Sequence, residues 1–187
     1  MTAKVLVLVG SLRAGSVNRQ LAHTATEIAP EGVDLTLFDG IGQLPFYNED
    51  IDVAGATPVA AVAFRDALVE SDAILILTPE YNGTMPAVLK NAIDWASRPM
   101  GESAIMGKPV AVIGSAYGQF GGVWAQDEAR KALGISGARV LEDAKLSIAG
   151  SVVRFAELHP RQDAEVVGQL GEIIAALNAA IQAPAAA

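Results

Sequence analysis

The stretch from Val5 to Asn18, VLVLVGSLRAGSVN, decides the fold. Its first five residues form an uninterrupted apolar run, which is typical of a parallel strand covered on both faces. The turn GSLRAGSVN at residues 10–18 follows directly and leads into a helical pattern. The first N–H groups of a helix have no partner within it and carry partial positive charge. This strand, turn and helix therefore predict an anion-binding site.

The side chains of the turn favour a phosphate group as that anion. Ser11, Ser16 and Asn18 supply hydrogen-bond donors, and Arg13 adds a fixed charge that suits phosphate oxygens. Because the protein as a whole is acidic, a bound dianion needs such local positive charge. The alternative is an ordinary Ser- and Gly-rich turn that only caps a helix.

The spacing excludes two common nucleotide motifs. Gly10 and Gly15 are separated as in a P-loop, but Ser16 and Val17 stand where that motif requires Lys and then Ser or Thr. Leu12 occupies the position of the second glycine in the dinucleotide fingerprint. A terminal monophosphate, such as that of a mononucleotide cofactor, is the remaining candidate.

Composition limits the classes of protein further. A chain of 187 residues, 51% hydrophobic and 18% charged, can form one compact domain. A net charge of −8 with no basic stripe argues against nucleic-acid binding. The chain has no cysteine, and His23 and His159 are too isolated to suggest a metal centre. The apolar run after Lys4 is too short for a signal peptide or a membrane span, so we expect a cytoplasmic protein.

The rest of the chain alternates strand and helix patterns. Strands are predicted at residues 5–9, 33–38, 73–77, 108–114 and 138–141, and helices at 18–29, 58–70, 86–97, 123–133 and 163–180. Five such rounds predict an α/β fold of the flavodoxin-like type: a doubly wound five-stranded parallel sheet in the order 2-1-3-4-5, with helices on both faces. We expect a single domain over residues 1–187, with a frayed tail at 183–187.

Three loops are expected to converge at the carboxyl ends of these strands, where such folds bind ligands. They are the turn at 10–18 and the loops at 78–86 and 115–122. The second is stiff because it contains Pro79 and Pro86, and the glycines of both later loops let backbone approach a flat ligand. The helix after Pro86 points its positive end at the same place, where a reduced flavin gathers negative charge. Taken singly, each loop is better interpreted as an ordinary Gly/Pro turn.

A long connection runs between Gly40 and Pro58 and contains LPFYNED at residues 44–50. Loops of this length in compact α/β domains are usually functional or sites of association. The alternative is an acidic surface excursion pinned by Phe46.

These motifs together resemble the NADPH-dependent FMN reductases, a family that includes quinone, chromate and azo-dye reductases with a flavodoxin-like fold. The resemblance extends to about Ala149 and rests on the segments GSLRAGSVN (10–18), LP (44–45), NED (48–50), PEYNG (79–83), Pro86, LKNAIDW (89–95), GKPV (107–110) and GQFGG (118–122). The resemblance also implies homodimers or homotetramers, with the long connection and the helix after Pro86 near the subunit contacts.

The same resemblance implies a binding site for FMN. The residues that would bind its phosphate are Ser11, Arg13, Ser16, Val17 and Asn18. Those that would line its ring are Pro79, Glu80, Tyr81, Asn82 and Gly83. Ser115, Tyr117 and Gly118 would contact the ring or the ribityl chain.

The predicted function is an FMN-dependent NAD(P)H oxidoreductase. Hydride would pass from NADPH or NADH to FMN, and then to a small-molecule acceptor: a quinone, free flavin, azo compound or metal oxyanion. The cofactor carries this chemistry, so no catalytic side chain and no metal ligand is assigned. Lys90, Asp94 and Trp95 have helical spacing that favours packing or a surface ion pair. The alternative function is a flavodoxin-type electron carrier that binds FMN without oxidising NAD(P)H.

Overall fold

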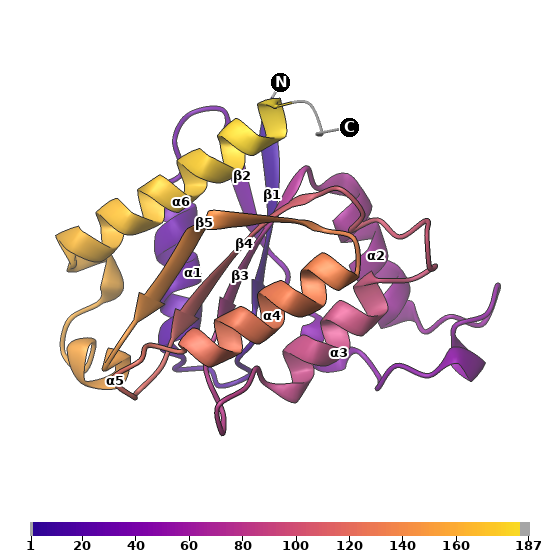
Figure 1. The fold of residues 1–187 in the computed structure, drawn as a ribbon, viewed down its shortest axis with the longest axis horizontal. Coiled ribbons are helices and arrows are strands. Elements are labelled where there is room, and N and C mark those ends of the chain that lie inside the picture. Colours follow the sequence, from indigo (N-terminus) through magenta and orange to yellow (C-terminus); the bar gives the residue numbers. More distant parts are fainter. Residues whose placement is uncertain (1, 184–187) are drawn as a thin grey trace.

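The computed structural model describes residues 2–183, and they form one parallel sheet flanked by helices (Figure 1). The strand order is β2-β1-β3-β4-β5, as the sequence predicts, and every neighbouring pair is parallel. The strands are β1 (Ala3–Val9), β2 (Val33–Leu37), β3 (Ala73–Thr78), β4 (Pro109–Ser115) and β5 (Arg139–Ile148). The flavodoxin-like fold class is therefore confirmed.

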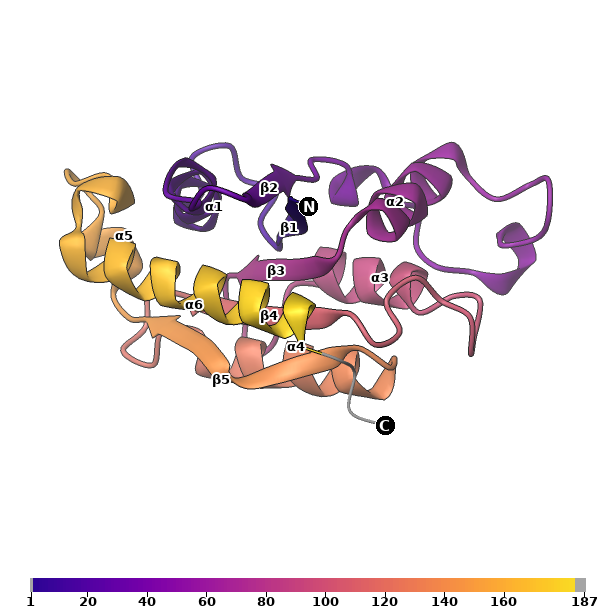
Figure 2. The ribbon, with the colours of Figure 1, turned by 90° about the horizontal axis from the view of Figure 1, so that it is seen from above.

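Helices cover both faces of the sheet, and Figure 2 shows the layers from above. The alternation of side chains along β1 explains the two layers, because Val5 and Val7 enter one core and Leu6 and Leu8 enter the other. The first core lies under α1 (Val17–Glu27) and α6 (Ala164–Gln182). The second lies under α2 (Val59–Glu70), α3 (Ala87–Ala96) and α4 (Val123–Ile135). Short helical turns complete the chain: η1 (Ile41–Gln43), η2 (Glu49–Ile51), α5 (Ser151–Arg154) and η3 (Pro160–Gln162).

The fifth strand corrects the sequence prediction, which ended it at residue 141. β5 runs to Ile148, with a shift of register on the way: Val110 pairs with Val140, but Val112 pairs with Lys145. The extra residues of β5 form a bulge and interrupt its apolar pattern. The buried Arg130 holds the bulge, since its Nη2 donates to the carbonyl oxygen of Leu141 at 3.0 Å.

Helix α6 is long and apolar enough, with a mean hydropathy of 1.3, to be compared with a membrane span. Its apolar side chains Val166, Leu170, Ile173 and Leu177 are buried in the core beneath it. One face of α6 is therefore a core face, while its apolar window as a whole is 28% buried. Beyond Ala183, the tail predicted at 183–187 lies outside the described residues.

The long connection at residues 40–58 is anchored to α3, but not through Phe46. The side chain of Phe46 is 80% exposed, so the alternative in which Phe46 pins the loop is wrong. Two side chains of α3 hold the loop by its backbone instead. Asn91 Nδ2 and Trp95 Nε1 both donate to the carbonyl oxygen of Pro45, at 3.0 Å and 2.7 Å.

An ion pair closes the far end of the same connection. Arg65 of α2 holds both carboxylate oxygens of Asp52 at 2.7 Å, and it lowers the pKa of that carboxyl below its usual value.

Lys90 and Asp94 form an exposed ion pair on α3, at 2.6 Å, and Trp95 is fully buried. The packing and ion-pair roles predicted for these three residues of α3 are confirmed.

Candidate functional site

The segments that follow β1, β3 and β4 line a pocket of about 170 Å³ at the carboxyl end of the sheet. We call it the carboxyl-end pocket. Its lining contains every predicted site residue except Asn82, Gly83 and Gly118. The lining residues are Ser11, Arg13, Ser16, Val17, Asn18, Pro79, Glu80, Tyr81, Ser115, Ala116, Tyr117, Ser151 and Val152.

The turn at residues 10–18 presents unused donors to this pocket. Ser16 is the N-cap residue of α1, yet its side chain accepts no hydrogen bond from the helix, and the first turn of α1 holds no acidic residue. The first N–H groups of α1 therefore remain available to an anion. Ser11 and Ser16 are buried, whereas Arg13 is exposed at the edge of the pocket.

Asn18 and Ser115 join the first turn to the end of β4. Asn18 Nδ2 donates to the carbonyl oxygen of Ser115 at 3.2 Å. Asn18 Oδ1 and Ser115 Oγ are both buried, and neither has a hydrogen-bond partner among the described residues. Buried polar atoms without partners are costly, so these two indicate a place that a polar ligand completes.

A tight hairpin forms the loop between β3 and α3. Tyr81 and Thr84 pair across it through backbone hydrogen bonds of 3.0 Å and 3.2 Å. Asn82 and Gly83 form its tip, with φ of 55° and 75°, a backbone conformation that the dipeptide Asn-Gly favours. Asn82 lines a separate open hollow with Lys90. The tip thus lies outside the lining of the carboxyl-end pocket, whereas Tyr81 belongs to it.

Glu80 faces α4 as well as the pocket. Its Oε2 accepts hydrogen bonds from the N–H groups of Trp124 at 3.0 Å and Ala125 at 3.2 Å. These N–H groups belong to the first turn of α4, so Glu80 caps a helix that begins more than forty residues later in the sequence. The side chain of Glu80 therefore has a structural role in addition to the predicted contact with a ligand.

The loop at residues 115–122 packs closely against its neighbours. A Cβ on Gly121 would lie 2.8 Å from backbone atoms of Ile148, and the φ of Gly121 is 62°. Gly118 accepts hydrogen bonds through its carbonyl oxygen from Gly121 and Gly150, both at 3.2 Å, and is absent from the pocket lining. Tyr117 is exposed at the mouth of the pocket.

Sequence reasoning missed a fourth segment of the pocket, at the end of β5. Ser151 and Val152 line it together with Ala116, and the N–H of Ser151 donates to the carbonyl oxygen of Ala116 at 3.0 Å. The missed signal is the length of β5. A strand ending at Ile148 brings the residues that follow it to the same edge of the sheet as the other three loops.

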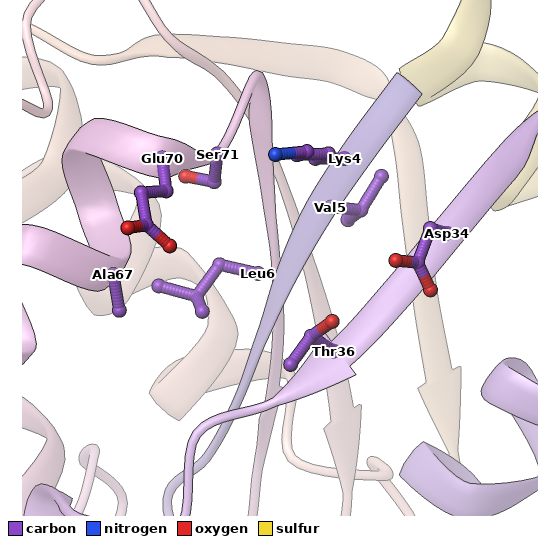
Figure 3. A pocket seen from close by; sticks show the side chains of 8 residues that line it. All are labelled: Lys4, Val5, Leu6, Asp34, Thr36, Ala67, Glu70 and Ser71. Atoms are coloured by element: carbon purple, nitrogen blue, oxygen red, sulfur yellow. The ribbon is translucent and has the colours of Figure 1, made fainter. Parts of the chain in front are cut away.

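A second hollow, of about 180 Å³, lies at the opposite end of the sheet (Figure 3). We call it the amino-end hollow; it is lined by Lys4, Val5, Leu6, Asp34, Thr36, Ala67, Glu70 and Ser71. Its buried hydroxyl is satisfied, since Ser71 Oγ donates to the carbonyl oxygen of Leu68 at 2.9 Å. Its size matches that of the carboxyl-end pocket, but it lacks that pocket's unpartnered buried atoms. Among residues 2–183, no group of three or more His, Asp or Glu side chains is arranged to hold a metal ion.

Comparison with known proteins agrees with the resemblance. The family described as NADPH-dependent FMN reductase matches residues 3–152. A 2-hydroxy-1,4-benzoquinone reductase from a Burkholderia species is 48% identical over 130 residues, which cover 70% of this chain and 69% of that protein. An NAD(P)H-dependent FMN reductase from Pseudomonas aeruginosa is 46% identical over 130 residues, with shares of 70% and 69%.

A solved structure extends the similarity over nearly the whole chain. FerB, a flavoenzyme NAD(P)H:(acceptor) oxidoreductase from Paracoccus denitrificans, superposes with a TM-score of 0.78 at 30% sequence identity. The match covers 95% of this chain and 98% of that chain. The family match already includes β5 and ends at residue 152, so the wider coverage of this structure extends the similarity toward α6.

Proposed function

Because the chain belongs to the NADPH-dependent FMN reductase family, we propose that it is an NAD(P)H:quinone oxidoreductase that binds FMN in the carboxyl-end pocket. The family is one of oxidoreductases that use FMN and NAD(P)H. The observation that carries the placement of the cofactor is the pair of buried, unpartnered atoms Asn18 Oδ1 and Ser115 Oγ beside the open N-terminus of α1. A phosphorylated polyol chain supplies hydrogen-bonding groups both for these two atoms and for the N-terminus of α1.

The residues of the pocket divide into two groups in this proposal. The FMN phosphate binds at the start of α1, where Arg13 supplies charge and the other contacts come from Ser11, Ser16, Val17 and Asn18. The ribityl chain and the ring lie toward the later loops, against Ser115, Tyr117, Gly118 and residues 79–83. Ser151, which the resemblance did not assign, adds a hydroxyl on the β5 side.

When bound, FMN supplies the chemistry, by accepting hydride from NAD(P)H and passing it to the second substrate. The protein's own part is to hold the phosphate, to fix the ring at the pocket mouth and to leave room there for each substrate in turn. No side chain of the pocket is asked to act as a nucleophile or a general base.

The mouth of the pocket favours a flat, neutral acceptor. The chain has few aromatic residues, 5% of the total, yet Tyr81 and Tyr117 expose their rings in the pocket lining. Phe120, in the same loop as Tyr117, and Trp124, in the first turn of α4, are exposed as well. Phe120 and Trp124 pack together with ring centroids 5.0 Å apart. Such rings stack on a quinone. The net charge of −8 disfavours the approach of a metal oxyanion.

We also propose a cytoplasmic homo-oligomer, a dimer or tetramer, with no membrane or nucleic-acid partner. Support for self-association comes from the side of the molecule formed by α3 and α4, where a hollow of about 340 Å³ contains exposed apolar residues. Met100 and Ile135 in this hollow are 83% and 80% exposed. Exposed apolar residues gathered in one place are typical of association surfaces.

An anaerobic experiment tests the proposed function. FMN-loaded protein is mixed with NADPH, or with NADH, and the flavin absorbance is followed. We expect rapid bleaching by at least one nucleotide, and return of the absorbance when benzoquinone is added, faster than when chromate is added. An electron carrier of the flavodoxin type would bind FMN but would bleach slowly or not at all. Protein that retains no FMN would refute the proposal.

A further inference from the structure

Glu80 joins the loop that lines the carboxyl-end pocket to the start of α4. It belongs to the loop between β3 and α3, and its Oε2 accepts from the N–H groups of Trp124 and Ala125 at 3.0 Å and 3.2 Å. The N-cap residue of α4 is Gly122, which has no side chain to offer, and no acidic residue lies in the first turn of α4. Glu80 therefore supplies the cap that the local sequence of α4 lacks.

A second contact along α4 supports the same junction. Thr84, at the other end of the hairpin, donates its hydroxyl to the carboxylate of Glu128. The hairpin is thus held to α4 at two points, and Glu80 is the one of the pair that also lines the carboxyl-end pocket. Loss of Glu80 would free the ring side of the hairpin and leave Thr84 to hold its outer side.

Because Glu80 caps α4 and no acidic side chain caps α3, the N-termini of these two helices differ in charge. Each helix carries partial positive charge at its start. At α3 the N-cap residue is Pro86, no side chain caps the helix, and its first turn holds no acidic residue, so its positive end is uncompensated. At α4 the full negative charge of Glu80 more than offsets the partial charge of the helix. Glu80 thus makes one wall of the pocket more negative, and it forms no ion pair with any residue among 2–183.

This charge has a direct consequence for a flavin, which gains negative charge on reduction. A fixed charge near the ring is one of the means by which a protein tunes this cofactor. We propose that Glu80 is a positioning residue that locks the 78–86 loop onto α4, and that its negative charge lowers the reduction potential of the bound FMN. The inference rests on the proposed function, because it requires FMN in this pocket.

Three variants separate the hydrogen bonds of Glu80 from its charge. Glu80→Gln keeps an oxygen that can accept from both N–H groups but removes the charge. Glu80→Ala removes both. Glu70→Gln removes the same charge at the amino-end hollow and serves as the matched control. The measurements are the dissociation constant of FMN from the apoprotein, the midpoint potential of the bound FMN, and hydrogen exchange of the Trp124 and Ala125 amides in the apoprotein.

We expect Glu80→Gln to bind oxidised FMN within about threefold of wild type, because one oxygen can accept both bonds. Its preference for reduced over oxidised FMN should rise up to tenfold, a rise in potential of up to about 30 mV for two electrons. Glu80→Ala should bind FMN at least tenfold more weakly and should exchange both amides faster, whereas Glu80→Gln should protect them. Glu70→Gln should match wild type in all three measurements.

The possible failures are distinct. Wild-type affinity for FMN and wild-type amide protection in Glu80→Ala would overturn the positioning role. An unchanged or lowered potential in Glu80→Gln would overturn the role of the charge. If Glu80→Ala fails to fold, Glu80→Gln still tests the charge through the potential, and its amide protection tests the hydrogen bonds. Wild-type protein that binds no FMN would overturn the proposed function and this inference together, whereas normal wild-type binding with unaffected variants would overturn this inference alone.

Discussion

The two ends of the sheet hold hollows of nearly equal volume, about 170 Å³ and 180 Å³, but only one has the features of a ligand site. At the carboxyl end, Asn18 and Ser115 bury polar atoms that no described residue satisfies. At the amino end, Ser71 is buried and satisfied, and the charged side chains Lys4 and Glu70 are exposed (Figure 3). Ser103, Arg130 and Arg139 also bury an unpartnered polar atom elsewhere, so it is the pairing of such atoms with a pocket and an open helix N-terminus that distinguishes the carboxyl end.

The largest expected effect comes from adding a side-chain atom where the loop at residues 115–122 packs against the end of β5. In Gly121→Ala, the new Cβ would lie 2.8 Å from backbone atoms of Ile148, and the φ of 62° would be strained. We expect a loss of about 2 to 3 kcal/mol of unfolding free energy and loss of FMN during gel filtration. Urea denaturation and the flavin-to-protein absorbance ratio measure the two effects.

Gly118→Ala is the matched control in the same loop. Its added Cβ has no atom within 4 Å, and its φ is not in the left-handed region. The change in unfolding free energy should stay within about 0.5 kcal/mol. Equal behaviour of the two variants would mean that close packing behind the pocket does not maintain it.

The next largest effect compares one positive charge at each end of the sheet. Arg13→Ala should weaken FMN binding by about 10- to 100-fold, since a hydrogen bond to a charged group contributes about 1.5 to 3 kcal/mol. Lys4→Ala removes the same net charge at the amino-end hollow and should change FMN affinity less than about twofold. Fluorescence titration of each apoprotein with FMN gives both values. Equal weakening would show that overall charge, rather than contact at the turn, governs binding.

The sequence predicts the sheet well because its strands are uninterrupted apolar runs. Val5–Val9 and Ala73–Leu77 are buried throughout, so no polar residue interrupts their apolar pattern. The end of β5 could not be read in the same way, because a bulge between residues paired with Val110 and Val112 breaks its alternation. The fold was therefore predictable except where the backbone departs from a regular ladder.

The candidate site was predictable to the extent that it follows from topology. Ser11, Asn18 and Ser115 come together because strands with parallel neighbours end at one edge of the sheet. Ser151 was missed with the end of β5. The cap that Glu80 provides could not be predicted, because its partners lie 44 and 45 residues away and become neighbours only through packing.

The smallest expected effect concerns Lys108, whose ammonium group donates to the carbonyl oxygen of Ser71, a residue that lines the amino-end hollow. Burial lowers the pKa of Lys108 below its usual 10.5, and the nearby charge of Asp72 opposes this in part. The charged form is therefore less favourable in the folded protein than in the unfolded chain.

This sets the sign of a pH dependence. Between the lowered pKa and 10.5, the unfolded chain holds a proton on Lys108 that the folded protein has released, so unfolding free energy rises with pH across that window. Lys108→Met lacks this contribution. The stability of wild type relative to Lys108→Met, from urea denaturation, should increase from pH 7 toward pH 10.5, while FMN affinity at pH 7 stays the same in both. A difference in unfolding free energy that does not change with pH would mean that Lys108 is not desolvated. Weaker FMN binding by Lys108→Met would mean that the two ends of the sheet do not act independently.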